Sequence, residues 1–140
     1  MYNEGMLKEN SLENKSFIVT GGGSGLGKSM SSYLLSLGAN VIIVSRDEQK
    51  LKKATDDLKI NCNSNNQIIY QVCDVKDSSM IENVIDNSFS EFNHIDGIIN
   101  NAAGNFISPT ENLSPNAFSA IIDIVLKGTC TFSLLYGKKC

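Results

Sequence analysis

Residues 17–29 read FIVTGGGSGLGKS, and this stretch decides the fold. A short β-branched run ends at Thr20, four glycines fall between Gly21 and Gly25, and a helical pattern starts at once. Glycine lets the backbone approach an anion closely, and the first turn of a helix offers unpaired N–H groups at the positive end of its dipole. The stretch therefore predicts a strand, a phosphate-binding turn and a helix.

The turn fits two nucleotide-binding motifs. Residues 22–29 match the P-loop pattern G-x-x-x-x-G-K-[ST], in which Lys28 reaches the β- and γ-phosphates and Ser29 holds magnesium. Residues 20–27 match T-G-x-x-x-G-x-G, a dinucleotide-binding turn with a wider first spacing. The commoner G-x-G-x-x-G spacing is absent because Leu26 stands where its last glycine is needed. The turn alone therefore predicts a nucleotide without choosing which one.

Four short apolar runs are typical of buried parallel strands: Phe17–Thr20, Val41–Val44, Ile68–Val72 and Ile95–Ile99. Helical periodicity separates them, and a last helical pattern follows Ser114 and Pro115, a natural N-cap and first helical residue. The polar stretch 61–67 predicts only a solvated loop. This alternation predicts an α/β fold with helices on both faces. We expect the first four strands of a Rossmann-type doubly wound parallel sheet, in the order 3-2-1-4.

The composition is that of one ordinary globular domain and excludes several classes of protein. Of 140 residues, 41% are hydrophobic and 19% are charged, and a net charge of −3 offers no basic surface for nucleic acid. No apolar run approaches membrane-spanning length, so we expect no membrane span. Residues 1–14 form a polar segment without a targeting signal, and residues 15–140 form the predicted domain. Four cysteines without C-x-x-C spacing and one histidine predict no metal site and an intracellular protein.

Ligands of such sheets bind beyond the carboxyl ends of the strands. After the second strand, Ser45 stands where an NAD binder usually carries an acid, and Arg46 follows it. A guanidinium can grip the 2′-phosphate of NADPH in a forked geometry, although Arg46 can equally be an exposed residue at a helix start. After the third strand, Asp74 either accepts from an adenine amino group or caps the next helix. After the fourth, small residues at 102–104 beside Asn101 either admit a flat ring or form a plain turn.

Together these sites occur in the order seen in the short-chain dehydrogenase/reductase family, which the chain resembles over nearly its whole length. In that resemblance the P-loop match is accidental, and Lys28 points towards solvent. Residues 101–110, 113–118, 123–126 and 128–129 more narrowly resemble the 2,4-dienoyl-CoA reductases. The resemblance assigns the cofactor NADPH to Thr20, Gly21, Gly23, Ser24, Gly25, Leu26, Gly27, Ser45, Arg46, Asp74, Asn101, Ala102, Ala103 and Gly104.

The resemblance also implies a reaction, the NADPH-dependent reduction of 2,4-dienoyl-CoA thioesters in fatty acid β-oxidation. Asn105 falls on the family's asparagine and is the catalytic residue, a donor to the thioester oxygen where charge develops. The acyl-CoA substrate is assigned to Arg46, Lys76, Asn105, Phe106 and Ser114. Lys76 stands where mitochondrial-type relatives carry arginine, so the charge is kept and the fork is lost. The resemblance implies a mitochondrial or peroxisomal location and a homo-oligomeric parent fold.

The family's catalytic tyrosine and lysine lie after the next strand, which this sequence does not reach. Tyr136 does not replace them, because Cys140 rather than lysine follows four residues later. Val125 stands where ordinary dehydrogenases of the superfamily carry a relay asparagine, which fits the dienoyl subgroup. We therefore expect the N-terminal part of a dienoyl-CoA reductase that is inactive alone, with an exposed fourth strand and an apolar last helix. The alternatives are a non-catalytic dinucleotide-binding remnant and a P-loop nucleotide binder.

Overall fold

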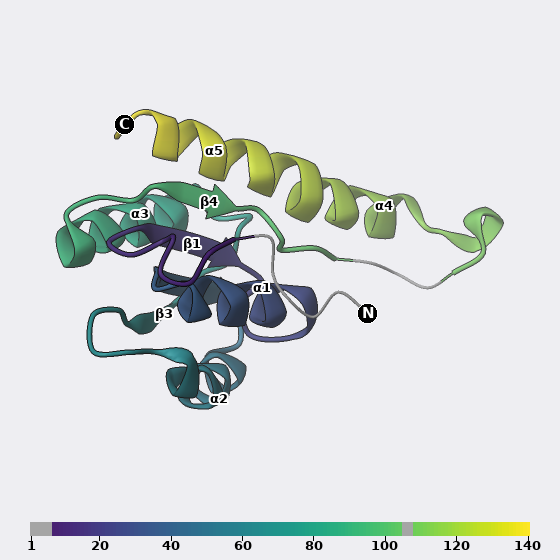
Figure 1. The fold of residues 1–140 in the computed structure, drawn as a ribbon. Coiled ribbons are helices and arrows are strands. Elements are labelled where there is room, and N and C mark those ends of the chain that lie inside the picture. The colour runs from purple at the N-terminus through teal and green to yellow at the C-terminus, as the bar shows by residue number, and fades with distance from the viewer. Residues whose placement is uncertain (1–6, 105–107) are drawn as a thin grey trace.

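The computed structural model describes residues 7–104 and 108–140, which form one parallel four-stranded sheet flanked by helices (Figure 1). The strands are β1 (Ser16–Thr20), β2 (Asn40–Ser45), β3 (Ile68–Val72) and β4 (Gly97–Ile99). Their order is β3-β2-β1-β4, with every pair parallel. The α/β class and the order 3-2-1-4 are therefore confirmed.

The helices alternate with the strands as predicted. They are α1 (Gly25–Ser36), α2 (Glu48–Leu58), α3 (Ser78–Phe92), α4 (Pro115–Ile122) and α5 (Thr129–Gly137), with short 3₁₀ turns at Lys59–Asn61 and Thr110–Asn112. A π-helical segment, Asp123–Gly128, joins α4 to α5, so that Pro115–Gly137 is one continuous helix. Single-turn π segments occur mostly inside α-helices and frequently near functional sites.

The core lies on both faces of the sheet, because successive strand residues point to opposite sides. Ile42 and Val44 of β2 face one cluster, which α3 and α5 complete with residues such as Ile81 and Phe132. On the other face a second cluster collects Val19, Val41, Ile43, Leu35 and Leu51 from β1, β2, α1 and α2. Figure 1 shows these two helical layers on opposite sides of the sheet. Burial on both faces explains the nearly continuous apolar character of β2.

Strand β4 is shorter than the run that predicted it, since it begins at Gly97 rather than Ile95. The side chain of Asp96 is the reason. Its Oδ2 accepts a hydrogen bond from Ser16 N at 2.9 Å, while Asp96 N donates to Ser16 O at 2.8 Å. A side chain thus takes the place of a ladder bond at the start of β1.

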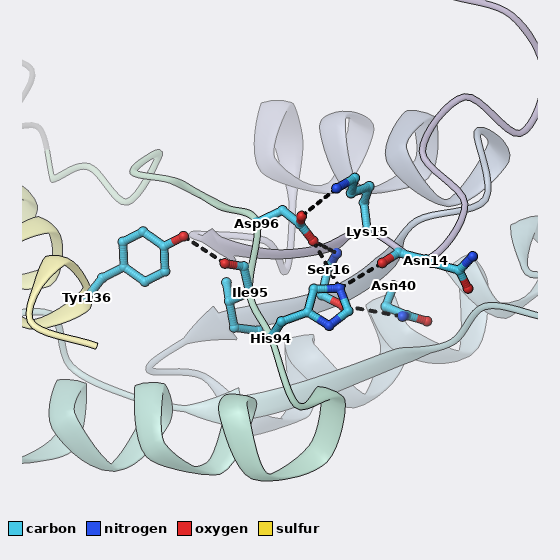
Figure 2. A network of polar contacts seen from close by, with 8 residues as sticks. All are labelled: Asn14, Lys15, Ser16, Asn40, His94, Ile95, Asp96 and Tyr136. Carbon is cyan, nitrogen blue, oxygen red and sulfur yellow. Dashed lines mark hydrogen bonds and ion pairs between the residues drawn. The ribbon is translucent and has the colours of Figure 1, made fainter. Parts of the chain in front are cut away.

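The same carboxylate anchors a network at the amino ends of β1 and β4 (Figure 2). Asp96 Oδ1 pairs with Lys15 Nζ at 2.9 Å, and His94 Nε2 lies 2.7 Å from Asn14 O. Tyr136 of α5 donates to Ile95 O at 2.8 Å. The network ties the last helix and residues 14–15 to the sheet, at the end opposite the glycine-rich turn.

The loop 61–67 does more than the sequence predicted. Asn66 is buried, and its Nδ2 donates to Leu35 O and Ala39 O, at 2.9 Å each. These carbonyls lie at the end of α1 and just before β2. A buried amide that satisfies two backbone acceptors fixes this connection, so the interpretation of 61–67 as a loop without a role is wrong at Asn66.

The continuous helix Pro115–Gly137 leaves much of its apolar surface uncovered. Gly128 and Phe132 are buried, whereas Phe118, Leu126 and Leu134 are more than half exposed. By length and composition alone, this helix is also long and apolar enough to cross a membrane. Our expectation that no segment approaches that length is therefore wrong on those two measures. A helix that packs against another protein surface produces the same pattern.

Candidate functional site

The carboxyl ends of the strands converge on two adjoining cavities. The first has a volume of about 120 Å³ and is lined by Gly21, Val44, Ser45, Arg46, Cys73, Asp74, Val75, Ala102, Ala103 and Ile124. The second has a volume of about 620 Å³ and is lined by Gly21, Gly23, Ser24, Ser45, Arg46, Asp47, Lys50 and Ala103. The structure thus brings together predicted site residues from the ends of β1, β2, β3 and β4.

Gly21 in the turn after β1 and Gly27 at the start of α1 are positions where the geometry requires glycine. Gly21 has a φ of +68°, which L side chains rarely adopt. Gly27 is buried, and a Cβ there would overlap the carbonyl oxygen of Gly21. The start of α1 therefore packs directly on the turn, and its first N–H groups, which no helix carbonyl can satisfy, remain beside it.

The polar side-chain atoms of Thr20 and Asn101 form hydrogen bonds within the protein and shape the site. Thr20 Oγ1 accepts from Asn101 N at 3.0 Å and from Ala102 N at 2.9 Å. Asn101 Nδ2 donates in turn to Thr20 O at 3.0 Å. These hydrogen bonds join the glycine-rich turn to the loop after β4, and Thr20 is buried between them.

The turn itself presents small and exposed residues to the second cavity. Gly23 and Ser24 line it, and Ser24 is the N-cap of α1 without a capping bond from its hydroxyl. Leu26 is 77% exposed on the first turn of α1 and lines neither cavity. Gly25 lines a separate hollow between α1 and α2.

Two residues of opposite charge, Arg46 and Asp47, follow the end of β2. Asp47 Oδ1 accepts from Lys50 N at 3.0 Å and caps α2, which supplies the negative charge that a helix N-terminus favours. That backbone hydrogen bond, together with the Lys50 ammonium, holds the pKa of Asp47 below its ordinary value despite partial desolvation. Arg46 is exposed, lines both cavities and makes no ion pair within the described ranges 7–104 and 108–140.

Asp74 does not cap the following helix. Asp77 does so, with its Oδ1 accepting from Ser79 N and Met80 N at 2.9 and 3.1 Å. Asp74 instead lines the first cavity, and its Oδ1 accepts from Lys76 N at 3.0 Å. Lys76 is exposed with its Nζ 3.8 Å from Asp74 Oδ2, and it is not among the residues that line either cavity.

The predicted substrate residues are less well placed. Asn105 and Phe106 lie outside the described residues. Ser114 Oγ accepts from Ala117 N at 3.1 Å, so this hydroxyl caps α4, as its position before Pro115 predicts. Gly104 is half-buried, and a Cβ there would lie 2.6 Å from Ile124 Cδ1.

Sequence reasoning missed Val44, Cys73, Val75 and Ile124 in the first cavity, and Asp47 and Lys50 in the second. Nothing in helical periodicity marks Ile124, because the π segment changes which side chains of the helix point towards the sheet. The signal for Lys50 was available, since it stands three residues after the N-cap Asp47 at the start of α2.

The P-loop interpretation does not fit this geometry. Lys28 Nζ pairs with Asp57 Oδ2 at 2.6 Å, so it is directed at α2. Lys28 and Ser29 line the hollow between α1 and α2, whereas neither lines a cavity at the strand ends. A P-loop lysine must instead reach the phosphates that the glycine-rich turn cradles.

The sequence profile of the short chain dehydrogenases matches residues 15–136. This chain belongs to the short-chain dehydrogenase family. It is 40% identical, over 99% of its length, to a probable 2,4-dienoyl-CoA reductase 3 of Caenorhabditis elegans. It is 37% identical, over 84% of its length, to a probable 2,4-dienoyl-CoA reductase of Bacillus subtilis. The chain spans less than half the length of these two relatives, 44% and 45% respectively.

The fold comparison agrees with the sequence comparison. A crystal structure of a short chain dehydrogenase from Bacillus anthracis superposes with a TM-score of 0.85 and 39% identity. The match covers 92% of this chain and 52% of that one. Short-chain dehydrogenases are oxidoreductases that bind a nicotinamide dinucleotide. The glycine-rich turn at the start of α1 and the exposed Arg46 line the same cavity at the carboxyl end of the sheet.

Proposed function

We propose that this short-chain dehydrogenase binds NADPH at the carboxyl end of its sheet, as the N-terminal part of a 2,4-dienoyl-CoA reductase. The observation that carries the proposal is the pair Ser45–Arg46 at the end of β2. Neither residue is acidic, and both line the second cavity together with the glycine-rich turn. A cation in this position favours a ribose that bears a 2′-phosphate over one that bears a hydroxyl.

In this proposal, different residues of the two cavities bind different parts of NADPH. The glycine-rich turn and the first turn of α1 hold the diphosphate, and Arg46 grips the 2′-phosphate. Asp74 accepts a hydrogen bond from the adenine amino group, and Ala102 and Ala103 give a flat ring room against the backbone. Residues 15–140 carry this binding, preceded by the polar segment 1–14.

The proposed substrate is a 2,4-dienoyl-CoA thioester, in keeping with the names of the relatives. NADPH supplies the hydride, and Asn105 donates to the thioester oxygen on which charge develops. Arg46, Lys76, Phe106 and Ser114 contact the acyl-CoA. The reaction belongs to β-oxidation, and relatives named peroxisomal support a peroxisomal or mitochondrial location.

We expect the 140-residue polypeptide to bind NADPH without reducing dienoyl-CoA. The resemblance places the family's catalytic tyrosine and lysine beyond Cys140, and loss of one donor to an oxyanion costs about 10²–10³ in rate. A titration that follows NADPH fluorescence tests the binding, with NADH and Mg·ATP as comparisons. Tighter binding of Mg·ATP than of NADPH would overturn the proposal.

The substrate part needs a longer protein. In a version extended with the C-terminal half of a relative, Asn105→Ala should lower turnover of dienoyl-CoA and leave NADPH affinity nearly unchanged. Undiminished turnover would remove Asn105 from the catalytic machinery. An extended protein that binds NADPH but reduces no dienoyl-CoA would instead favour a non-catalytic dinucleotide-binding remnant.

A further inference from the structure

Lys50 of α2 is a charged residue that lines the second cavity beside Arg46 and Asp47. The glycine-rich turn lies over the first turn of this helix. A Cβ built at Gly23 would lie 3.7 Å from Lys50 Cβ and 3.8 Å from Leu51 N. A single methyl group would therefore fill the space between Gly23 and the base of the Lys50 side chain, which places Lys50 beside the turn that the proposed function gives to phosphate.

Without this lysine the wall of the second cavity would carry no net charge. Of the described residues that line the second cavity, two are cationic, Arg46 and Lys50, and one is anionic, Asp47. Asp47 must stay close, because it caps α2. Its hydrogen bonds to Lys50 keep its pKa low, so it carries a full negative charge at neutral pH.

An uncompensated carboxylate next to Arg46 would oppose the binding of a phosphate dianion. Lys50 Nζ lies 3.3 Å from Asp47 Oδ2 and offsets that charge. With Lys50 present, the wall keeps the net positive charge of Arg46. Without it, Asp47 cancels Arg46.

We propose that Lys50 determines specificity for the phosphorylated dinucleotide, by neutralising Asp47 beside Arg46. The proposal rests on the proposed function, since it concerns the same dinucleotide site. Both dinucleotides carry the diphosphate, but only NADPH adds a charged 2′-phosphate, so removal of this charge should weaken NADPH more than NADH. The expected signature is therefore a loss of selectivity between the two dinucleotides, which a merely structural lysine would not produce.

The test compares Lys50→Gln with Lys52→Gln in the 140-residue chain, by calorimetric titration with NADPH and with NADH. Lys52 is a matched control, because it is an exposed lysine of the same helix that pairs with Glu48 and lines neither cavity. Lys50→Gln should weaken NADPH by about three- to fivefold and NADH by less than about twofold, while Lys52→Gln leaves both unchanged. Lys50→Arg should retain the selectivity.

A second pair of variants separates charge balance from direct contact. Asp47→Asn preserves the N-cap, because Asn and Asp cap equally well, and removes the anion. The double variant Asp47→Asn with Lys50→Gln should recover most of the lost NADPH affinity. Failure to recover, or equal losses for Lys50→Gln and Lys52→Gln, would overturn the role of Lys50. A parent chain that binds neither dinucleotide would overturn the proposed function itself.

Discussion

At the end of β2, the neighbouring residues Arg46 and Asp47 have opposite charges, and their side chains have different contacts. Asp47 turns back to cap α2, and Arg46 lines both cavities. The sequence left open whether Arg46 is a ligand-binding residue or an ordinary residue at a helix start. The structure places it at the helix start and on the cavity wall together, which makes its contribution measurable by a single substitution.

Arg46→Ala should weaken NADPH binding by about 1–3 kcal/mol, because a phosphate dianion loses a charged hydrogen-bond partner. NADH binding should change little, because its 2′-hydroxyl carries no charge. Dissociation constants for both dinucleotides, measured with the 140-residue chain, decide the matter. An equal loss for NADH would mean that Arg46 does not meet the 2′-phosphate.

Gly27 gives a second prediction at the scale of single residues. Gly27→Ala should lower the free energy of unfolding by about 1–3 kcal/mol, because its methyl group would overlap the backbone oxygen of Gly21. Gly137 is the control, since a Cβ there would meet no atom of the described residues within 4 Å. Urea denaturation should show Gly137→Ala as stable as the parent or slightly more so. A Gly27→Ala protein of unchanged stability would contradict the close packing of the turn on α1.

At the scale of elements, alternating apolar runs and helical periodicity predicted every strand, its neighbours and the helices between them. Periodicity could not predict where β4 begins, because Ser16 N donates to the side chain of Asp96, in place of a backbone ladder bond just before the strand. It could not predict the π segment either, since apolar spacing cannot distinguish one wide turn inside a helix. For the candidate site, the glycine-rich turn and the strand ends could be predicted from the sequence. The place of Ile124 in the wall of the first cavity could not, because it depends on tertiary packing.

The contact between α5 and the sheet gives a prediction that depends on pH. Burial, with Cys140 and Asp96 nearby, raises the pKa of Tyr136 from 10.0 to about 12. A raised folded-state pKa means that this contribution to stability is complete below pH 10.0 and is lost as the pH rises towards 12. At pH 8, Tyr136→Phe should cost about 1 kcal/mol, for the lost bond to Ile95 O. Denaturation curves should show this difference shrinking by pH 11, and a constant difference would contradict the shifted pKa.

At the scale of the whole molecule, the β4 edge of the sheet and the helix Pro115–Gly137 offer two surfaces for contacts among the described residues. Strand β4 is an edge strand of three residues, and the helix Pro115–Gly137 exposes Phe118, Leu126 and Leu134. An unpaired sheet edge and exposed apolar side chains are typical of a surface that binds another protein chain or a membrane. The family expectation of a homo-oligomer makes a second copy of this chain the first partner to test.

We expect the 140-residue chain to self-associate through this helix, because association buries apolar side chains that water now surrounds. Sedimentation velocity at micromolar concentration should show species larger than 15.2 kDa. Replacing Leu126 and Leu134 together by lysine should shift the distribution towards monomer. Unchanged sedimentation of that double variant would place the contact elsewhere, and vesicle flotation of the parent chain tests the membrane alternative.

The hydroxyl of Thr20 also constrains the order in which the molecule is assembled. Its bonds join it to Asn101 N and Ala102 N, 81 and 82 residues away. Contacts at such separation form only after a long loop has closed, so the glycine-rich turn can be complete only once β4 has docked on β1. Hydrogen exchange at these two amides then reports sub-global opening of the site. A bound dinucleotide should slow both together, even though neither amide needs to touch it.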